Sequence, residues 1–273
     1  MSILNAASKR KFKRFKSTQT REECKYFPKN KNELEGIIED RVDEDPQCDL
    51  NDIWVGDITV MCYLFGRSNF NGDISRWDVS NVKDMNSMFG SCAFDGDISN
   101  WDVSNVEDMS WMFDESAFNG DISEWNVSNV EDMCGMFNRS KFNGDLGDWN
   151  VGNVTDMSFM FHCCPFDGDI SKWDVSKVTN MNSMFEYSFF NGDISSWNVD
   201  SVIEMSGMFE GSKFNGDISR WDVRNVKNMN SMFYKCPFNG DVSSWDVSNV
   251  REMSFIFKNC PLEKNPPKWY KPF

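Results

Sequence analysis

Aspartates recur at a fixed interval through most of the chain, and carboxylates in such a row could bind cations. Successive members are 24 residues apart: Asp73, Asp97, Asp121, Asp145, Asp169, Asp193, Asp217 and Asp241. If their segments stack, neighbouring carboxylates lie ~5 Å apart and repel by just under ~1 kcal/mol in water. Either hydrogen bonds from turn amides and Ser hydroxyls or a row of bound Ca²⁺ must offset this repulsion. We expect the hydrogen bonds, because the nine-residue Ca²⁺-binding pattern is absent.

The residue types needed for other site chemistry are sparse. Cys92, Cys164, Cys236 and Cys260 share one repeat position, which holds Ser in other copies, so we predict buried free thiols there. The single histidine, His162, lies at a variable position and is predicted to be an exposed helix residue. There is no phosphate-binding loop, nucleophile elbow, HExxH or paired CxxC motif. The sequence therefore predicts no enzyme activity, no catalytic residues and no cofactor.

The elements that position these side chains are copies of one 24-residue unit. Eight copies fill residues 70–261 without insertion or deletion, and the first reads FNGDISRWDVSNVKDMNSMFGSCA. A constant period of this length is typical of a solenoid, in which each coil stacks on the one before. The tryptophans give the register: Trp77, Trp101, Trp125, Trp149, Trp173, Trp197, Trp221 and Trp245.

Within one coil the apolar spacing changes half-way. The segment ISRWDV alternates like a short strand, and its spacing matches the core of leucine-rich repeats. The segment SNVKDMNSMF has the spacing of a two-turn helix, and FNGD is a turn whose Asn-Gly tolerates positive φ. We predict an α/β repeat solenoid of short parallel strands and short helices. Its core positions are Phe70, Ile74, Trp77, Val79, Val82, Met85, Met88 and Phe89.

The two ends of the array have their own signals. Residues 49–69 form a degenerate first coil, and the solenoid extends to 269 because Leu262 and Trp269 continue the Phe and Trp positions. Residues 262–273 are rich in Pro and suit a C-terminal cap that blunts the sheet edge. Residues 30–48 predict an N-terminal capping helix with Asn32 as N-cap and Glu35 as its capping-box partner. Residues 1–29 predict a basic, mobile arm.

Charge is distributed unevenly along the chain. The formal net charge is −15, but residues 1–31 hold ten Lys/Arg and two Glu, and the remainder is strongly acidic. This balance disfavours a general nucleic-acid binder. The cluster KRKFKRFK at 9–16 could contact nucleic acid or an anionic membrane, or have no function. No apolar run is long enough to cross a bilayer and no export signal is recognisable. We therefore expect an intracellular protein, in the cytoplasm or nucleus.

Specific binding is expected where the copies differ. One variable position places Trp111, Phe159 and Phe255 on the outer side of the predicted helix, where they could anchor a partner or pack on a flank. A second variable position follows the turn in each coil and is occupied by mostly charged residues. Its candidate binding residues are Arg76, Glu124, Lys172 and Arg220. The Trp row alternates with Val on the core face, so we assign it to packing.

The repeat pattern F-N-G-D-I-S-x-W-D-V-S-N-V-x-D-M-x-x-M-F resembles the BspA-like leucine-rich repeat surface proteins, and specifically their mycoplasma-type repeat of unknown function. The resemblance covers about 49–269. It implies an interaction module without catalytic residues; bacterial members are often secreted or lipid-anchored adhesins, and related arrays occur inside cells. We therefore expect a non-enzymatic protein-interaction scaffold that is monomeric and binds a protein. The alternative is a surface adhesin or a Ca²⁺-stabilised ligand-binding protein.

Overall fold

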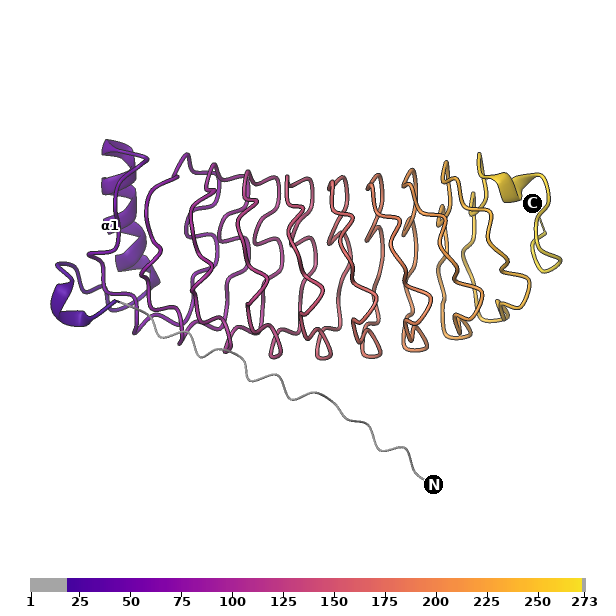
Figure 1. The fold of residues 1–273 in the computed structure, drawn as a ribbon, viewed down its shortest axis with the longest axis horizontal. Helices are drawn as coiled ribbons and strands as arrows, with labels where there is room; N and C mark the ends of the chain where they lie inside the picture. Colours follow the sequence, from indigo (N-terminus) through magenta and orange to yellow (C-terminus); the bar gives the residue numbers. More distant parts are fainter. Residues whose placement is uncertain (1–18, 272–273) are drawn as a thin grey trace, which may run out of the picture.

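The computed structural model describes residues 19–271, and Figure 1 shows them as a row of coils stacked side by side. The named elements are few: the 3-10 helix η1 (Arg21–Glu23), the α-helix α1 (Lys31–Glu44) and the 3-10 helix η2 (Pro261–Glu263). Everything between α1 and η2 is turns and isolated bridges. The basic cluster at 9–16 lies outside the described residues. None of the described helices is long and apolar enough to cross a membrane.

The coils are held in register by parallel bridges between residues 24 apart. Asp84 bridges Asp108, which bridges Asp132, and the series continues to Glu252. Around these bridges every second amide donates to the next coil: Met85 N to Asp108 O at 2.9 Å and Phe89 N to Met112 O at 2.9 Å. The predicted stack of 24-residue coils is therefore present.

The predicted short helix and short strand are wrong in the described coils. Where a helix was expected, alternate amides close turns, as Met88 N does on Met85 O at 3.1 Å, and the amides between them bond the next coil. A helix would use the donors beyond its first turn inside one coil and take them away from the stack. Where a strand was expected, Trp77 N closes a turn on Ile74 O at 3.1 Å. A chain of turns satisfies the same apolar spacing.

Two positions in every regular coil have left-handed backbone. The first column runs Tyr63, Ser87, Trp111, Gly135, Phe159, Ser183, Gly207, Ser231 and Phe255, with φ between 52° and 63°. The second lies four residues later and runs Arg67, Ser91, Glu115, Arg139, Cys163, Tyr187, Gly211, Lys235 and Asn259. This conformation costs roughly 1–2 kcal/mol for a residue other than glycine. It is tolerated because it aims alternate amides at the next coil.

Glycine is required in the FNGD turn for a different reason from the one predicted. Positive φ was expected there, but the described glycines with positive φ are Gly135, Gly207 and Gly211. A Cβ on Gly96 would lie 2.7 Å from the ring of Phe94 instead. The turn therefore needs glycine because the Phe ring two residues earlier folds beneath it.

The predicted core positions are buried in the first seven copies, whereas Val247, Val250 and Met253 of the eighth copy are partly buried. Phe70, Trp77 and Met88 are at most 1% exposed, and their equivalents in the later copies are at most 4% exposed. The rings form ladders: Phe89 and Phe113 stack at 5.6 Å, and Trp77 and Trp101 at 6.5 Å. Each Trp also donates its indole N–H to the coil before it, as Trp101 Nε1 does to Ile74 O at 3.2 Å. That bond satisfies the indole N–H, a buried donor that would otherwise lack a hydrogen-bond partner.

The helix α1 stands against the first coil (Figure 1) and buries Leu34 and Ile38. Its N-cap is Asn30, whose side chain accepts from Glu33 N at 3.1 Å, so the predicted N-cap Asn32 is wrong. Both residues begin an Asn-x-x-Glu pattern, and the sequence alone does not separate them. Glu33 also accepts from Lys29 N, whereas the predicted partner Glu35 pairs with Lys31 at 2.5 Å.

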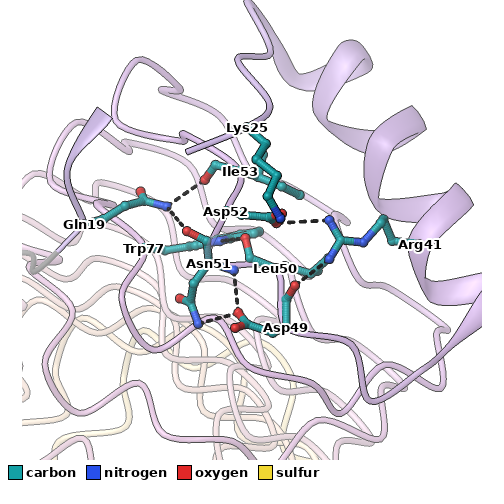
Figure 2. Close-up of polar contacts among 9 residues, drawn as sticks. All are labelled: Gln19, Lys25, Arg41, Asp49, Leu50, Asn51, Asp52, Ile53 and Trp77. Carbon is teal, nitrogen blue, oxygen red and sulfur yellow. Dashed lines mark hydrogen bonds and ion pairs between the residues drawn. The ribbon is translucent and has the colours of Figure 1, made fainter. Parts of the chain in front are cut away.

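Polar contacts join the N-terminal segment and α1 to the first coil, as Figure 2 shows. Arg41 donates to Asp52 Oδ1 at 3.0 Å and to Asp49 O at 2.6 Å. Gln19, which is buried, donates to the carbonyls of Asn51 and Ile53. At the opposite end Trp269 continues the Trp ladder and donates to Val242 O at 2.8 Å. Leu262 is only partly buried there.

Candidate interaction surface

The two left-handed columns hold exposed and half-buried aromatics of the array, and their residues vary from coil to coil. The first column holds Ser, Gly, Trp, Phe and Tyr, and the second holds charged, polar and aromatic residues as well as one Cys. The core columns beside them repeat the same few side chains. We call the surface formed by the two columns the left-handed face. It contains the predicted binding residues Trp111, Phe159 and Phe255.

Trp111 and Phe159 are joined on this face across the coil between them. Their ring centroids are 6.1 Å apart, although the residues belong to coils two apart. The contact is possible because the intervening residue is Gly135, whose added Cβ would lie 2.3 Å from the Trp111 ring. Both aromatics are half-buried. They pack on a flank, which is one of the two outcomes left open by the sequence.

On its other side Trp111 borders a hollow of about 520 Å³. Tyr63, 62% exposed and two coils earlier, lies at the opposite border, and Ser87 and Gly90 lie between. Arg67 and Asp114 add one charge of each sign to the lining. A second hollow of about 490 Å³ shares Tyr63 and Arg67 and continues to α1. On the helix side it is lined by the acidic residues Glu35, Glu39 and Asp43.

Phe255 lies at the far end of the array, and its side chain stays free of the Trp111–Phe159 pair. It is 63% exposed and borders a smaller hollow of about 230 Å³ next to Tyr270 and Glu263. The structure therefore divides the three predicted aromatics between two places. Trp111 and Phe159 lie together near the middle, and Phe255 is alone near the C-terminal end.

The second set of predicted binding residues occupies a different column. Arg76 is half-exposed and pairs with Glu23 at 3.6 Å, so it ties η1 to the array. Glu124, Lys172 and Arg220 are exposed in later coils. These residues do not line the hollows beside Trp111. The charged column is consequently a separate surface from the left-handed face.

The aspartate row is held by turns. Each carboxylate accepts the amide two residues ahead, as Asp121 does from Ser123 N at 3.0 Å and Asp193 from Ser195 N at 2.9 Å. Hydrogen bonds from the Ser123 amide and hydroxyl lower the pKa of Asp121, and Asp169, Asp217 and Asp241 behave alike. Within residues 19–271 no group of three or more His, Cys, Asp or Glu is placed to bind a metal ion.

The thiols of the Ser/Cys position are buried and free, as predicted. Each donates to the carbonyl of the Phe that begins its own copy, as Cys236 Sγ does to Phe214 O at 3.2 Å. Burial raises the pKa of Cys92, Cys164 and Cys260 to about 11. These thiols therefore stay protonated and act as packing groups.

Sequence reasoning missed Tyr63 and the left-handed backbone. Tyr63 occupies the Trp111 position two repeats earlier, so counting back by 24 from Ser87 would have found it. The residue types at that position also indicate a left-handed backbone, because Gly135 and Gly207 occur there among Ser and aromatic residues. Glycine that recurs at a variable surface position is typical of positive φ.

Comparison with protein families matches the chain to the family described as "Mycoplasma protein of unknown function, DUF285". The matches cover residues 42–139, 93–189 and 162–269, which together span the first coil to the C-terminal cap. The chain belongs to this family. A search of curated proteins finds no match, and neither does a search of solved structures.

The family agrees with the mycoplasma-type part of the resemblance, and its overlapping matches agree with a tandem repeat. Its description assigns no function. Any function must therefore be inferred from the surface of this chain.

Proposed function

We propose that the protein is a non-enzymatic scaffold that binds a partner protein on its left-handed face, at the two hollows between α1 and Trp111. The observation that supports this is the 520 Å³ hollow between Tyr63 and Trp111. Both residues stand where other coils have Ser or Gly, so the stack does not need their rings. Aromatic residues that border a hollow, here the exposed Tyr63 and the half-buried Trp111, are the kind of anchor on which protein interfaces rely.

The lining also indicates the chemistry of the partner. Tyr63 and Trp111 offer apolar walls for one large side chain, and Ser87 and Gly90 keep the floor open. Next to α1 the carboxylates of Glu35, Glu39 and Asp43 would attract a basic residue. The partner we propose is a polypeptide segment that presents an aromatic or aliphatic residue followed by Lys or Arg.

The test is affinity capture from the native host with Tyr63→Ser plus Trp111→Ser. Ser already occupies this position at Ser87, Ser183 and Ser231, so the double variant keeps a backbone that the coil accepts. A partner that binds the unchanged protein should be lost, with at least about a tenfold fall in affinity once it is purified. Phe255→Ser, at the far end, is the matched control and should keep the partner. Retention of every partner by the double variant would refute the proposal.

We also propose the oligomeric state, the location and the relationship that the sequence predicts. The scaffold is monomeric, is located inside the cell and is related to BspA-like leucine-rich repeat proteins through its repeat. We do not extend the proposal to a Ca²⁺-stabilised array, because turn hydrogen bonds already engage the Asp73 row, and no separate observation favours a surface adhesin. Nor do we extend it to the basic cluster at 9–16.

A further inference from the structure

A chain of polar side chains crosses three coils next to the second left-handed column and ends at an exposed thiol. Asp114 Oδ1 accepts from Asn138 Nδ2 at 2.6 Å, and Asn138 Oδ1 lies 2.6 Å from His162 Nδ1. The other ring nitrogen, His162 Nε2, lies 3.5 Å from Cys163 Sγ. The chain therefore places the protein's single imidazole directly beside a sulfur.

The hydrogen bond between Asp114 and Asn138 determines which nitrogen of His162 carries the proton. A carboxylate only accepts, so Asp114 fixes the NH₂ group of Asn138 toward itself and the amide oxygen toward the ring. Nδ1 must then carry the proton, and the lone pair of Nε2 faces Cys163. His162 is consequently oriented as a base for that thiol. The prediction that His162 is exposed is wrong, because its side chain is only 13% accessible.

Cys163 differs from the other thiols in its surroundings. It is the exposed cysteine, whereas the remaining eight are buried or intermediate. The four Ser/Cys-position thiols donate to backbone carbonyls. Cys24 likewise donates to Thr20 O at 3.4 Å, and Cys134 accepts from Ser158 Oγ at 3.2 Å. Cys163 thus combines access from solvent with an adjacent nitrogen base.

The groups around His162 and Cys163 would stabilise the charges that form when the thiol proton moves to the imidazole. Glu186 Oε2 lies 3.9 Å from His162 Nε2, so it would stabilise an imidazolium. Phe159 and Tyr187 meet the imidazole edge-on at 6.0 and 6.4 Å and confine the ring. In the unreacted protein burial raises the pKa of Cys163 and lowers that of His162, so both start neutral. The proton then moves only during attack.

We propose that Cys163 is a site of thiol–disulfide exchange for which His162 is the general base. Cys163 Sγ attacks one sulfur of a small disulfide while its proton passes to His162 Nε2. The S–S bond of the reagent breaks, a new bond joins Cys163 to the attacked sulfur, and the leaving thiolate takes the proton from His162. The products are one mixed disulfide and one free thiol, so no further oxidant is needed. The reaction is stoichiometric and goes beyond the scaffold role.

The test is the reaction of the folded full chain with 4,4′-dithiodipyridine, followed by thiopyridone release. We expect one fast thiol per chain and slow reaction of the others. Cys163→Ser should abolish the fast phase, and peptide mass spectrometry should place the mixed disulfide on Cys163. Cys24→Ser, which removes a thiol without a base, is the matched control and should leave the fast phase unchanged. A fast phase that survives in Cys163→Ser would overturn the assignment.

The role of His162 is tested by His162→Gln and by the pH profile. General-base help should make the unchanged protein at least about tenfold faster than the variant. The fast rate should fall as His162 becomes protonated, with Arg139 opposing and Asp114, Glu186 and Glu210 favouring that protonation. His162→Gln should lose this inflection. The role of His162 as the base would be refuted if the two proteins reacted at equal rates. It would also be refuted if the pH profile of the unchanged protein showed thiol ionisation alone.

Asn138 is a positioning residue in this proposal, and its test is spectroscopic. Asn138→Ala removes the acceptor for His162 Nδ1, so the ¹⁵N spectrum of the imidazole should lose its preference for the Nδ1–H tautomer. The fast rate should fall by less than in His162→Gln, since the base is still present. An unaltered tautomer in Asn138→Ala would overturn the positioning role.

Discussion

The core columns and the left-handed face are built from interleaved residues of the same turns, yet they obey opposite rules. Inside, the first seven copies all repeat Val, Met, Met and Phe at no more than 1% exposure. Outside, one position accepts Ser, Gly, Trp, Phe and Tyr. An inward side chain must match the coils above and below it, whereas an outward one needs only to tolerate positive φ. Repetition therefore marks packing, and variation marks the surface that is free to take on a function.

The largest expected effect comes from breaking the register that both regions share. Deleting residues 190–213 removes one whole coil, so Met181 N, which now bonds Glu204 O, would meet Asn228 O instead. The ladder closes again, and a shorter folded protein should result. Deleting only residues 190–201 places core side chains against turns and should abolish the cooperative transition. Denaturant unfolding checks both, and equal behaviour of the two deletions would refute the stack.

A second prediction compares one large residue in each region. Trp149 is 4% exposed and donates to Ile122 O at 3.1 Å, so Trp149→Ala should lower the free energy of unfolding by ~3–5 kcal/mol. Trp111→Ser removes the same side-chain type from the left-handed face. It loses one aromatic pair, worth ~0.5–1.5 kcal/mol. Chemical denaturation measures both, and similar losses would mean that the two regions do not differ.

The sequence predicted the repeat, the register and the core because these depend on spacing alone. Trp77 and Val79 point inward whether the segment that holds them is a strand or a chain of turns. The same reasoning fails for the backbone between core positions. Val82, Met85, Met88 and Phe89 suit a helix equally well, and only the hydrogen bonds to the next coil exclude it.

The candidate surface was predictable in part. Trp111 and Phe159 can be recognised from the sequence as departures from the repeat, but their contact also depends on Gly135 in the coil between them. The His162–Cys163 pair was beyond sequence reasoning because its geometry depends on Asn138, which lies one coil earlier. Contacts between coils 24 residues apart become visible only when the coil shape is known.

A third prediction addresses the left-handed backbone itself. Ser231 has φ 55°, so Ser231→Gly should stabilise the protein by up to ~1 kcal/mol by relieving the strain. Ser231→Val should destabilise it by ~1–2 kcal/mol or more, because a β-branched residue adopts positive φ poorly. Thermal unfolding of the two variants gives the difference. If valine were tolerated as well as glycine, the left-handed assignment would be incorrect.

A fourth, smaller effect distinguishes the carboxylates of the turn from those between coils. Hydrogen bonds lower the folded pKa of Asp121, so its contribution is present above the unfolded pKa and is lost as pH falls below about 4. Asp121→Ala should lower the free energy of unfolding by under ~1 kcal/mol at pH 7, and the gap to the unchanged protein should close in acid.

Asp132 provides the opposite case. Burial, with Asp108 and Asp156 on either side, raises its folded pKa, so its ionised form opposes folding at neutral pH and this cost disappears as pH falls. Asn occupies the same position at Asn180 and Asn228. Asp132→Asn should therefore be neutral or stabilising at pH 7. Unfolding curves from pH 7 to pH 3 test both signs, and a loss of stability in Asp132→Asn at pH 7 would contradict the argument.

The smallest expected effect is none at all. The carboxylates of the Asp73 row already accept hydrogen bonds from turn amides, as Asp241 does from Ser243 N at 2.9 Å. The hydrogen bonds from Ser243 also lower the pKa of Asp241. Removing divalent cations with excess EDTA should then leave the unfolding midpoint unchanged. Added Ca²⁺ should not raise it either, since a cation would have to displace those bonds or share the second carboxylate oxygen with poor geometry. A drop of several degrees with EDTA that Ca²⁺ restores would instead show that cations separate the row of carboxylates.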